Sequence, residues 1–391
     1  MERRIFLLFG LLVFLGIGLS LPDAGADVKV IKLANISPLS GPAAAWGIAG
    51  GRGHQMSAED IGVFKVAGQE YKWEIVNYDS KYVPSDALSA LNKAIFQDNI
   101  RYGWITGSGV HPPLLPLLRQ NWFVDMANMA GGVKFTNPEN PSLFRVMAST
   151  DQLIMTFFDD VYQMYKVKRV AIIVPNDEMG KADWELVLRL HKERKPDAQV
   201  VAEEFFERGM TDFYPALKRM LAKNPDMIFS NASPTGTVAL IAKQSRELGF
   251  KGIIYNPTAV LEAKVLWDTA GKASDNILVP RMWAEPPTKL YADLERRYVE
   301  KYKEPMLALY PEIYPLLPWI TKAMQKASSI DAQKVVPVLA DMPNPDHPCG
   351  PARWGGEKTY GIKRQIVYPV GLCILQDQKW KLVMKKVAEL E

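Results

Sequence analysis

The regular alternation of short apolar runs with amphipathic helical runs constrains the fold more than any other feature of this chain. Strand-like runs lie at residues 71–79, 102–106, 122–126, 169–174, 200–206, 226–230, 252–255 and 277–280, and helical spacing lies between them, as at 85–96, 151–165, 183–192, 213–222 and 236–248. Strands that alternate with helices predict a parallel sheet covered by helices. The rhythm restarts after Arg145, so we expect two consecutive α/β units. The later runs predict helices at 290–303 and 310–327 and a hairpin over 363–375 and 379–384.

The N-terminus predicts export. Arg3 and Arg4 precede an apolar run over residues 5–19, and Ala24-Gly25-Ala26 supplies a small-residue cleavage site. This pattern is typical of a secretory signal peptide over residues 1–26, cleaved near Ala26, with an uncleaved anchor as the minor alternative. The general secretory route is favoured, although the paired arginines also resemble a twin-arginine signal. We therefore expect a periplasmic product.

Chain length and net charge further restrict the class of protein. A mature chain of about 365 residues is too long for one compact domain and suits two lobes. The net charge of +4 is spread without basic runs, which argues against a nucleic-acid partner. A disulfide between Cys349 and Cys373 is feasible in an oxidising compartment, and the sequence leaves it open.

Enzymatic motifs are missing from the sequence. Metalloprotease, P-loop and the commoner serine-nucleophile signatures are all absent, and the four histidines, His54, His111, His191 and His347, are scattered. We expect no enzyme activity, no metal and no cofactor. Only His111 lies at a predicted strand-to-helix mouth, where open α/β sheets bind ligands, so it ranks second to the loops described next.

Two loops at the ends of predicted strands could hold a ligand. The first strand ends at Ser37-Pro38 and passes through Ser40-Gly41-Pro42 into a helix, whose N-terminus stabilises anionic groups. Trp46 would stand beside that turn as an apolar wall. After the strand at 102–106, glycines let the backbone approach a ligand, and Ser108 can donate to a carboxylate. Ordinary β-to-α connections are the alternative interpretation for both loops.

The order of an apolar strand, Pro38-Leu39-Ser40-Gly41-Pro42, an aromatic residue and a glycine resembles the opening of branched-chain-amino-acid-type substrate-binding proteins of ABC importers, the type I periplasmic binding proteins. Later segments are similar to further motifs of that family: Asp151-Gln152, residues 302–327, residues 350–358 and Trp380. The resemblance implies two Rossmann-like lobes with parallel sheets joined by a three-strand hinge. Matching the motifs gives residues 27–147 plus 281–352 to lobe one and residues 148–280 plus 353–391 to lobe two.

The resemblance also implies a ligand-binding set between the lobes: Trp46, Ser108, Gly109, Asn128, Ala130, Met179, Ser233, Asn256 and Thr258. This chain departs from the family pattern at several of these positions. Residues 128–130 carry no hydroxyl, Met179 replaces an aromatic residue, and residues 256–258 carry no carboxylate, since Glu262 lies several residues on. A buried ammonium without a carboxylate partner is costly, so we expect a ligand without an amino group. Trp283 could supply a second apolar face.

The functional hypothesis is a periplasmic substrate-binding component of an ABC importer that captures a small carboxylate-bearing solute, an amino acid or an aromatic or other organic acid, by hinge closure. Ligand contacts with both lobes would stabilise the closed form, which the inner-membrane permease subunits recognise. We expect a monomer. A soluble ligand sensor of the same fold is the alternative, and a secreted hydrolase is a weaker one.

Overall fold

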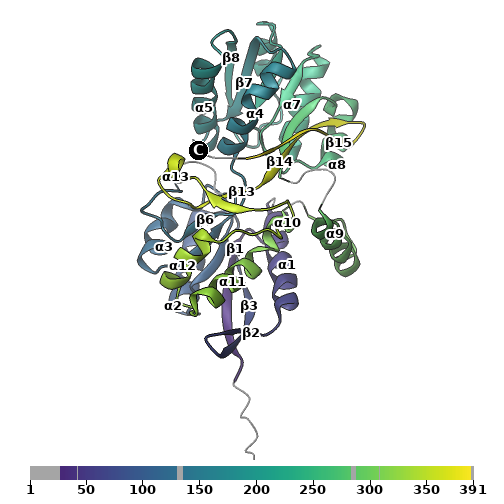
Figure 1. The fold of residues 1–391 in the computed structure, drawn as a ribbon. Helices are drawn as coiled ribbons and strands as arrows, with labels where there is room; N and C mark the ends of the chain where they lie inside the picture. The colour runs from purple at the N-terminus through teal and green to yellow at the C-terminus, as the bar shows by residue number, and fades with distance from the viewer. Residues whose placement is uncertain (1–26, 42, 130–134, 283–287, 308, 389–391) are drawn as a thin grey trace, which may run out of the picture.

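The computed structural model describes residues 27–41, 43–129, 135–282, 288–307 and 309–388. These residues form two lobes, each built on a central sheet with helices on its faces (Figure 1). The predicted signal peptide, Ala130 and Trp283 lie outside the described residues.

The first lobe contains an eight-stranded sheet in the order β12-β13-β6-β5-β4-β1-β3-β2. Its strands are β1 (Lys29–Ser37), β2 (Phe64–Val66), β3 (Gln69–Asp79), β4 (Tyr102–Ile105), β5 (Val124–Ala127), β6 (Leu143–Arg145), β12 (Arg353–Gly355) and β13 (Gln365–Val367). The central pairings from β3 to β13 are parallel, whereas β2 and β12 pair antiparallel at the two edges. The carboxyl ends of the central strands therefore meet at one edge of the sheet.

The second lobe contains a seven-stranded sheet in the order β15-β14-β11-β10-β9-β7-β8. Its strands are β7 (Arg169–Pro175), β8 (Gln199–Phe206), β9 (Met227–Ser230), β10 (Ile253–Tyr255), β11 (Ile277–Arg281), β14 (Pro369–Gln376) and β15 (Lys379–Val387). The strands from β8 to β11 are parallel, and the β14–β15 hairpin joins β11 in antiparallel pairing. The predicted α/β fold with two parallel-stranded lobes is confirmed, with antiparallel strands added at the edges.

Amphipathic helices cover both sheets (Figure 1). Those of the first lobe are α1 (Ala44–Ile61), α2 (Pro84–Phe96), α3 (Leu115–Gln120), α9 (Lys289–Tyr302), α10 (Tyr310–Ile313), α11 (Leu316–Ala327), α12 (Ala332–Asp341) and α13 (Glu357–Tyr360). Those of the second are α4 (Thr150–Met164), α5 (Glu178–Arg194), α6 (Tyr214–Leu221), α7 (Thr235–Glu247) and α8 (Ala263–Ala270). The predicted single helix over 310–327 is wrong, because it breaks into α10 and α11 at Pro315, which has no N–H to continue the helix.

The chain passes between the two sheets three times: between β6 and β7, between β11 and β12, and between β13 and β14. The third passage differs from the prediction, which gave residues 353–391 to the second lobe. β12 pairs with β13, and Gln365 of β13 pairs with Arg145 of β6, so residues 353–367 belong to the first sheet. The predicted hairpin likewise begins at Pro369 rather than at residue 363. The chain changes sheet between Val367 and Pro369.

Buried side chains brace the first passage against the third. The Gln152 amide donates to the carbonyls of Ile366 (3.1 Å) and Ala388 (2.6 Å), and its oxygen accepts from the Ser149 N–H (3.2 Å). The Gln365 amide donates to the Met147 carbonyl (2.8 Å). Because these groups are buried, each lost bond would leave a desolvated polar atom, and the bonds therefore fix the path of the chain between the lobes.

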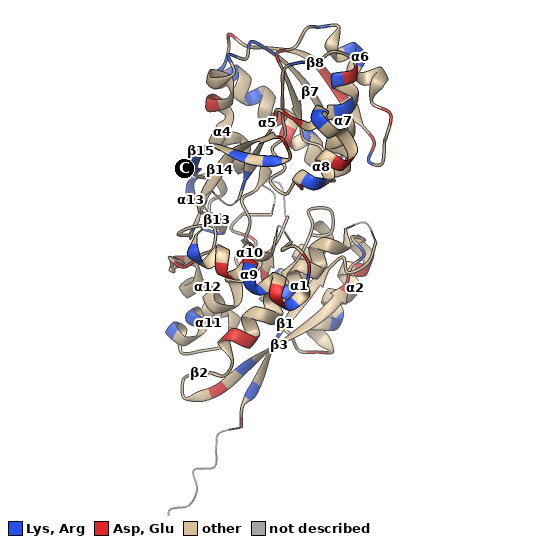
Figure 2. Cartoon of the chain, turned by 90° about the vertical axis from the view of Figure 1, so that its right-hand side faces the viewer, with Lys and Arg blue, Asp and Glu red and all other residues tan. Residues whose placement is uncertain are grey.

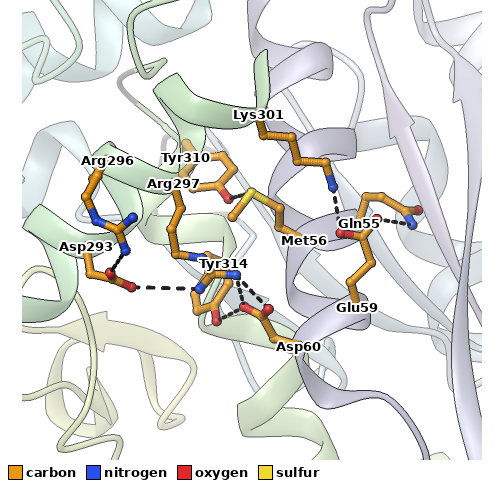
Figure 3. A network of polar contacts seen from close by, with 10 residues as sticks. All are labelled: Gln55, Met56, Glu59, Asp60, Asp293, Arg296, Arg297, Lys301, Tyr310 and Tyr314. Atoms are coloured by element: carbon orange, nitrogen blue, oxygen red, sulfur yellow. Dashed lines mark hydrogen bonds and ion pairs between the residues drawn. The ribbon is translucent and has the colours of Figure 1, made fainter. Parts of the chain in front are cut away.

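A network of ion pairs holds α9 against α1 (Figure 3). Asp60 on α1 accepts from Arg297 (2.6 Å) and from the Tyr314 hydroxyl (2.5 Å), and Glu59 pairs with Lys301 (2.6 Å). Hydrogen bonding to Asp60 raises the pKa of Arg297. Since α1 also carries Trp46, this network fixes one wall of the space between the lobes.

Charges of both signs lie on the helices of both lobes (Figure 2). Among the described residues, we find no helix that is both long and apolar enough to cross a membrane. Cys349 and Cys373 are both buried thiols, and the disulfide that the sequence left open is not formed in this structure.

Candidate functional site

A cavity of about 310 Å³ lies between the lobes, at the carboxyl ends of the parallel strands. The first lobe contributes Trp46, Tyr82, Ser108, Met129 and Arg145, the passage between the lobes contributes residues 147–150, and the second lobe contributes Met179, Arg208, Ser233 and residues 257–260. Ligands of open α/β folds bind at such strand ends. The geometry makes this cavity the candidate ligand site.

Five of the nine predicted residues line the cavity: Trp46, Ser108, Met179, Ser233 and Thr258. Gly109 is exposed on its loop and does not line the cavity, and Ala130 lies outside the described residues. Asn128 and Asn256 are buried beneath the cavity rather than facing it. The side-chain hydrogen bonds of Asn256 assign it to the support of the ligand loops.

Asn256 holds two loops of the second lobe together. Its amide donates to the Ala232 carbonyl (3.1 Å), and its side-chain oxygen accepts from the Thr258 N–H (2.8 Å). The Thr258 hydroxyl in turn donates to the Asn231 side-chain oxygen (3.1 Å). The loops after β9 and β10 are thus fixed to each other, which presents Ser233 and Thr258 to the cavity from one rigid base.

The loop after β4 is fixed in a similar way in the first lobe. The Ser108 hydroxyl donates to the Met129 carbonyl (2.6 Å), so in this structure its proton serves the neighbouring loop rather than a ligand. His111, which the sequence placed at the mouth of the strand, is fully buried and does not line the cavity. Its Nδ1 lies 2.6 Å from the Gly107 carbonyl oxygen and its Nε2 lies 3.1 Å from Asp125. His111 is therefore a positioning residue.

Tyr82 is a wall residue that the sequence analysis missed. Lys81 and Tyr82 both adopt positive φ (49° and 62°), and this turn directs the Tyr82 ring towards Trp46, with ring centroids 5.8 Å apart. A Cβ on Gly107, whose φ is 115°, would lie 2.3 Å from the Tyr82 ring. Glycine is thus required at residue 107 for both its conformation and the approach of Tyr82. Polar turn residues alone give no sign of this contact in the sequence.

Two arginines are the other residues that were missed. Arg145, at the end of β6, is buried, lies 3.7 Å from the Asp151 carboxylate, and its guanidinium stacks over the Tyr360 ring at 4.7 Å. Arg208, after β8, pairs with Asp177 (2.5 Å) and donates to the Ser233 carbonyl and hydroxyl (3.2 Å each). Arg208 follows the predicted strand at residues 200–206, and that position was the signal that could have found it. Arg145 ends β6, a three-residue strand that the sequence pattern did not predict, so no such signal pointed to it.

The lining of the 310 Å³ cavity is asymmetric in charge. It contains the two guanidinium groups of Arg145 and Arg208 and, among the described residues, no Asp or Glu. Ser149 and Thr150 at the start of α4 also line it, and a helix of this length favours negative charge at its N-terminus. The remaining wall is largely apolar and includes Trp46, Met147, Leu153 and Met179. Such a site suits a compact organic anion with an apolar body.

In the part of the chain that the structure describes, no group of three or more His, Cys, Asp and Glu side chains could hold a metal ion. His54 and His347 are fully buried, and burial lowers the pKa of each to about 3. Neither lines the cavity.

Residues 30–368 match the sequence model of the periplasmic binding protein family, and the chain belongs to that family. Among curated relatives, the leucine-, isoleucine-, valine-, threonine- and alanine-binding protein of Pseudomonas aeruginosa is 22% identical over 318 residues, which are 79% of this chain and 82% of the relative. The fold and the family together define a branched-chain-amino-acid-type binding protein.

Solved structures agree on the fold. A leucine-binding protein from Thermotoga maritima has a TM-score of 0.77 at 20% identity and covers 91% of this chain and 98% of its own. A solute-binding protein of an ABC transporter from Rhodopseudomonas palustris, solved with p-hydroxybenzoic acid, has a TM-score of 0.79 at 20% identity and covers 93% of this chain and 98% of its own. The type I periplasmic binding protein fold is therefore shared with proteins solved as leucine and aromatic-acid binders.

Proposed function

We propose that this protein is the periplasmic solute-binding component of an ABC importer and that it captures a carboxylate-bearing solute without an α-amino group. One observation carries the proposal: Arg145 and Arg208 line the cavity, and no carboxylate does so among the described residues. A carboxylate gains charge-assisted hydrogen bonds there, whereas an ammonium would find no carboxylate on the described part of the cavity wall, since Asp151 and Asp177 already pair with the two arginines. The aromatic-acid complex of the R. palustris relative is consistent with this ligand class.

The mechanism is closure of the two lobes around the solute. The ligand would contact Trp46 and Tyr82 from the first lobe and Arg208 and Thr258 from the second, so its contacts are more numerous when the lobes approach. A ligand shifts a conformational equilibrium only by its differential affinity for the two states. The closed form is then the species that the permease subunits of the inner membrane recognise, and no covalent step is involved.

The same proposal includes the cellular context. Export follows from the predicted signal peptide over residues 1–26, and the protein acts as a monomer. We place lobe one at residues 27–147 plus 282–367 and lobe two at residues 148–281 plus 368–391, with the last two boundaries guided by the strand pairing described above.

Native mass spectrometry of the mildly purified protein, followed by thermal-shift screening, tests the proposal. We expect a co-purified or stabilising organic acid without an amino group. Stabilisation by α-amino acids alone would refute the ligand class but retain the transport function. Conversion of a bound solute into product would instead indicate an enzyme.

A further inference from the structure

A second, smaller cavity of about 120 Å³ adjoins the first. Six residues line both cavities: Trp46, Met129, Ser233, Pro234, Thr258 and Val260. The two volumes are therefore neighbouring parts of the same inter-lobe space, and Trp46 forms part of the wall of both. A ligand anchored at the arginines can extend past Trp46 into the smaller cavity.

The smaller cavity differs from the larger one in chemistry. Ala45 and Ala49 come from α1, one turn apart, and their small side chains leave room beside Trp46. Leu261, Leu307 and Leu309 complete an apolar wall. An aromatic ring fits such a wall because it gains apolar contact without a hydrogen-bond requirement.

Glu262 is the one charged residue among the described residues that line this smaller cavity, whereas the guanidinium groups line only the larger one. The two parts of the combined space thus carry opposite charge. A ligand that fills both parts meets cationic donors at one end and an anionic acceptor at the other.

We infer that the solute is an extended aromatic carboxylate, longer than a single benzoate, with a distal hydroxyl group that donates a hydrogen bond to Glu262. This inference rests on the proposed function. Its carboxylate lies at Arg145 and Arg208, and its ring lies against Trp46. Glu262 is then a specificity-determining residue for this solute.

The surroundings of Glu262 favour a neutral hydroxyl donor over an ammonium. Desolvation raises the pKa of Glu262, and the nearby positive charge of Arg281 lowers it. Arg281 is itself buried, donates to the Leu261 carbonyl (3.0 Å) and stacks over the Trp380 ring at 4.7 Å. Because Glu262 already has this cationic neighbour, a ligand ammonium would face repulsion from Arg281.

Calorimetric titration with matched pairs of acids tests the inference. We compare cinnamate with 4-hydroxycinnamate, and benzoate with 4-hydroxybenzoate, on the wild type, Glu262→Met and Glu262→Gln. We expect the wild type to bind 4-hydroxycinnamate about ten-fold more tightly than cinnamate, with a smaller difference for the shorter pair. Glu262→Met abolishes the preference by weakening the hydroxylated acid alone, and Glu262→Gln, which keeps a neutral acceptor, retains part of it.

Glu185→Met is the matched control, because Glu185 is exposed on α5 and does not line either cavity. It should leave all four affinities unchanged. The inference is overturned if the wild type shows no preference for the hydroxylated acid, or if the preference survives in Glu262→Met. Tighter binding of 4-(aminomethyl)benzoate, lost in Glu262→Met, would also overturn it in favour of a cationic group. Failure of every carboxylate to bind would instead refute the proposed function.

Discussion

Replacement of Arg208 by glutamine tests the anionic end of the cavity most directly. In this structure the guanidinium pairs with Asp177 and donates to Ser233, and its side chain is 44% exposed. A hydrogen bond to a charged group contributes about 1.5–3 kcal/mol. Partial exposure places Arg208 at the lower end of that range, since solvent screens the interaction. Because 1.4 kcal/mol is a factor of ten in Kd, we expect Arg208→Gln to weaken benzoate binding about ten-fold.

The fold should tolerate this substitution. The Arg208–Asp177 pair is largely solvent-accessible, and such pairs contribute about 0–1 kcal/mol to stability. Asp177 also keeps its capping role on α5, where it accepts from the Gly180 N–H (2.9 Å). We therefore expect the melting temperature of the ligand-free variant to fall by no more than about 3 °C.

Calorimetry with benzoate and with neutral benzamide separates charge from shape. Arg219→Gln is the matched control, because Arg219 pairs with Glu204 (2.7 Å) on the same lobe without lining the cavity. The double variant Arg208→Gln with Asp177→Asn removes the carboxylate that the first change leaves unpaired. Unchanged benzoate affinity in Arg208→Gln, or an equal loss in Arg219→Gln, would refute the placement of the carboxylate. An equal loss for benzamide would do the same.

Three further changes test the fold and its loops. His54 is fully buried without a hydrogen-bond partner among the described residues, and burial lowers its pKa to about 3. Because the unfolded chain takes up this proton near pH 6.5 and the folded chain does not, the free energy of unfolding falls as the pH falls below about 6.5. His54→Leu should therefore remove about 3 kcal/mol of the acid-induced loss of unfolding free energy at pH 4, as measured by urea titration. Gly107→Ala should lower the free energy of unfolding by about 1–3 kcal/mol, because of the φ of 115° at this residue and the clash with Tyr82. Adding Tyr82→Ala to this variant should recover only the part of the loss that is due to the clash. Gln152→Leu should lower the free energy of unfolding by about 2–4 kcal/mol, because it removes three buried hydrogen bonds between the passages that join the lobes. A loss of less than about 0.5 kcal/mol would contradict that bracing role.

The sequence predicted the two-lobed fold because hydrophobic periodicity reports local structure directly. Strands such as β7 are continuous apolar runs between turn residues, and helices such as α4 show one apolar face. The third passage was misplaced because β12 and β13 are three residues long each, too short for a periodic signal. β13 joins the first sheet through β6, which lies more than 200 residues earlier in the chain, and pairing at that separation leaves no local trace.

The cavity was only partly predictable for a similar reason. Trp46 lies in the first turn of the helix that follows β1, and Thr258 lies in the loop that follows β10, so the resemblance found them. Arg145 and Arg208 are ordinary charged residues in the sequence, and only the packing of the strand ends around one space gives them a shared role. Asn256 was predicted as a ligand contact, yet its side-chain amide is hydrogen-bonded to the backbone of Ala232 and Thr258. Residue type and strand-end position do not distinguish a group that faces a cavity from one that supports it.

The wall of the cavity and the passages between the lobes are parts of one hydrogen-bonded structure. Ala148 lines the cavity, and its N–H donates to the Tyr368 hydroxyl (3.2 Å), which donates to the buried Glu312 carboxyl (3.0 Å) on α10. Tyr368 lies between β13 and β14, where the chain changes sheet for the third time. A solute that contacts residues 147–150 therefore acts on a segment that is bonded to another passage and to a helix of the first lobe. Since these buried bonds resist independent movement of the passages, lobe closure must carry the first and third passages together, and solute contacts on this segment bear directly on the closing motion.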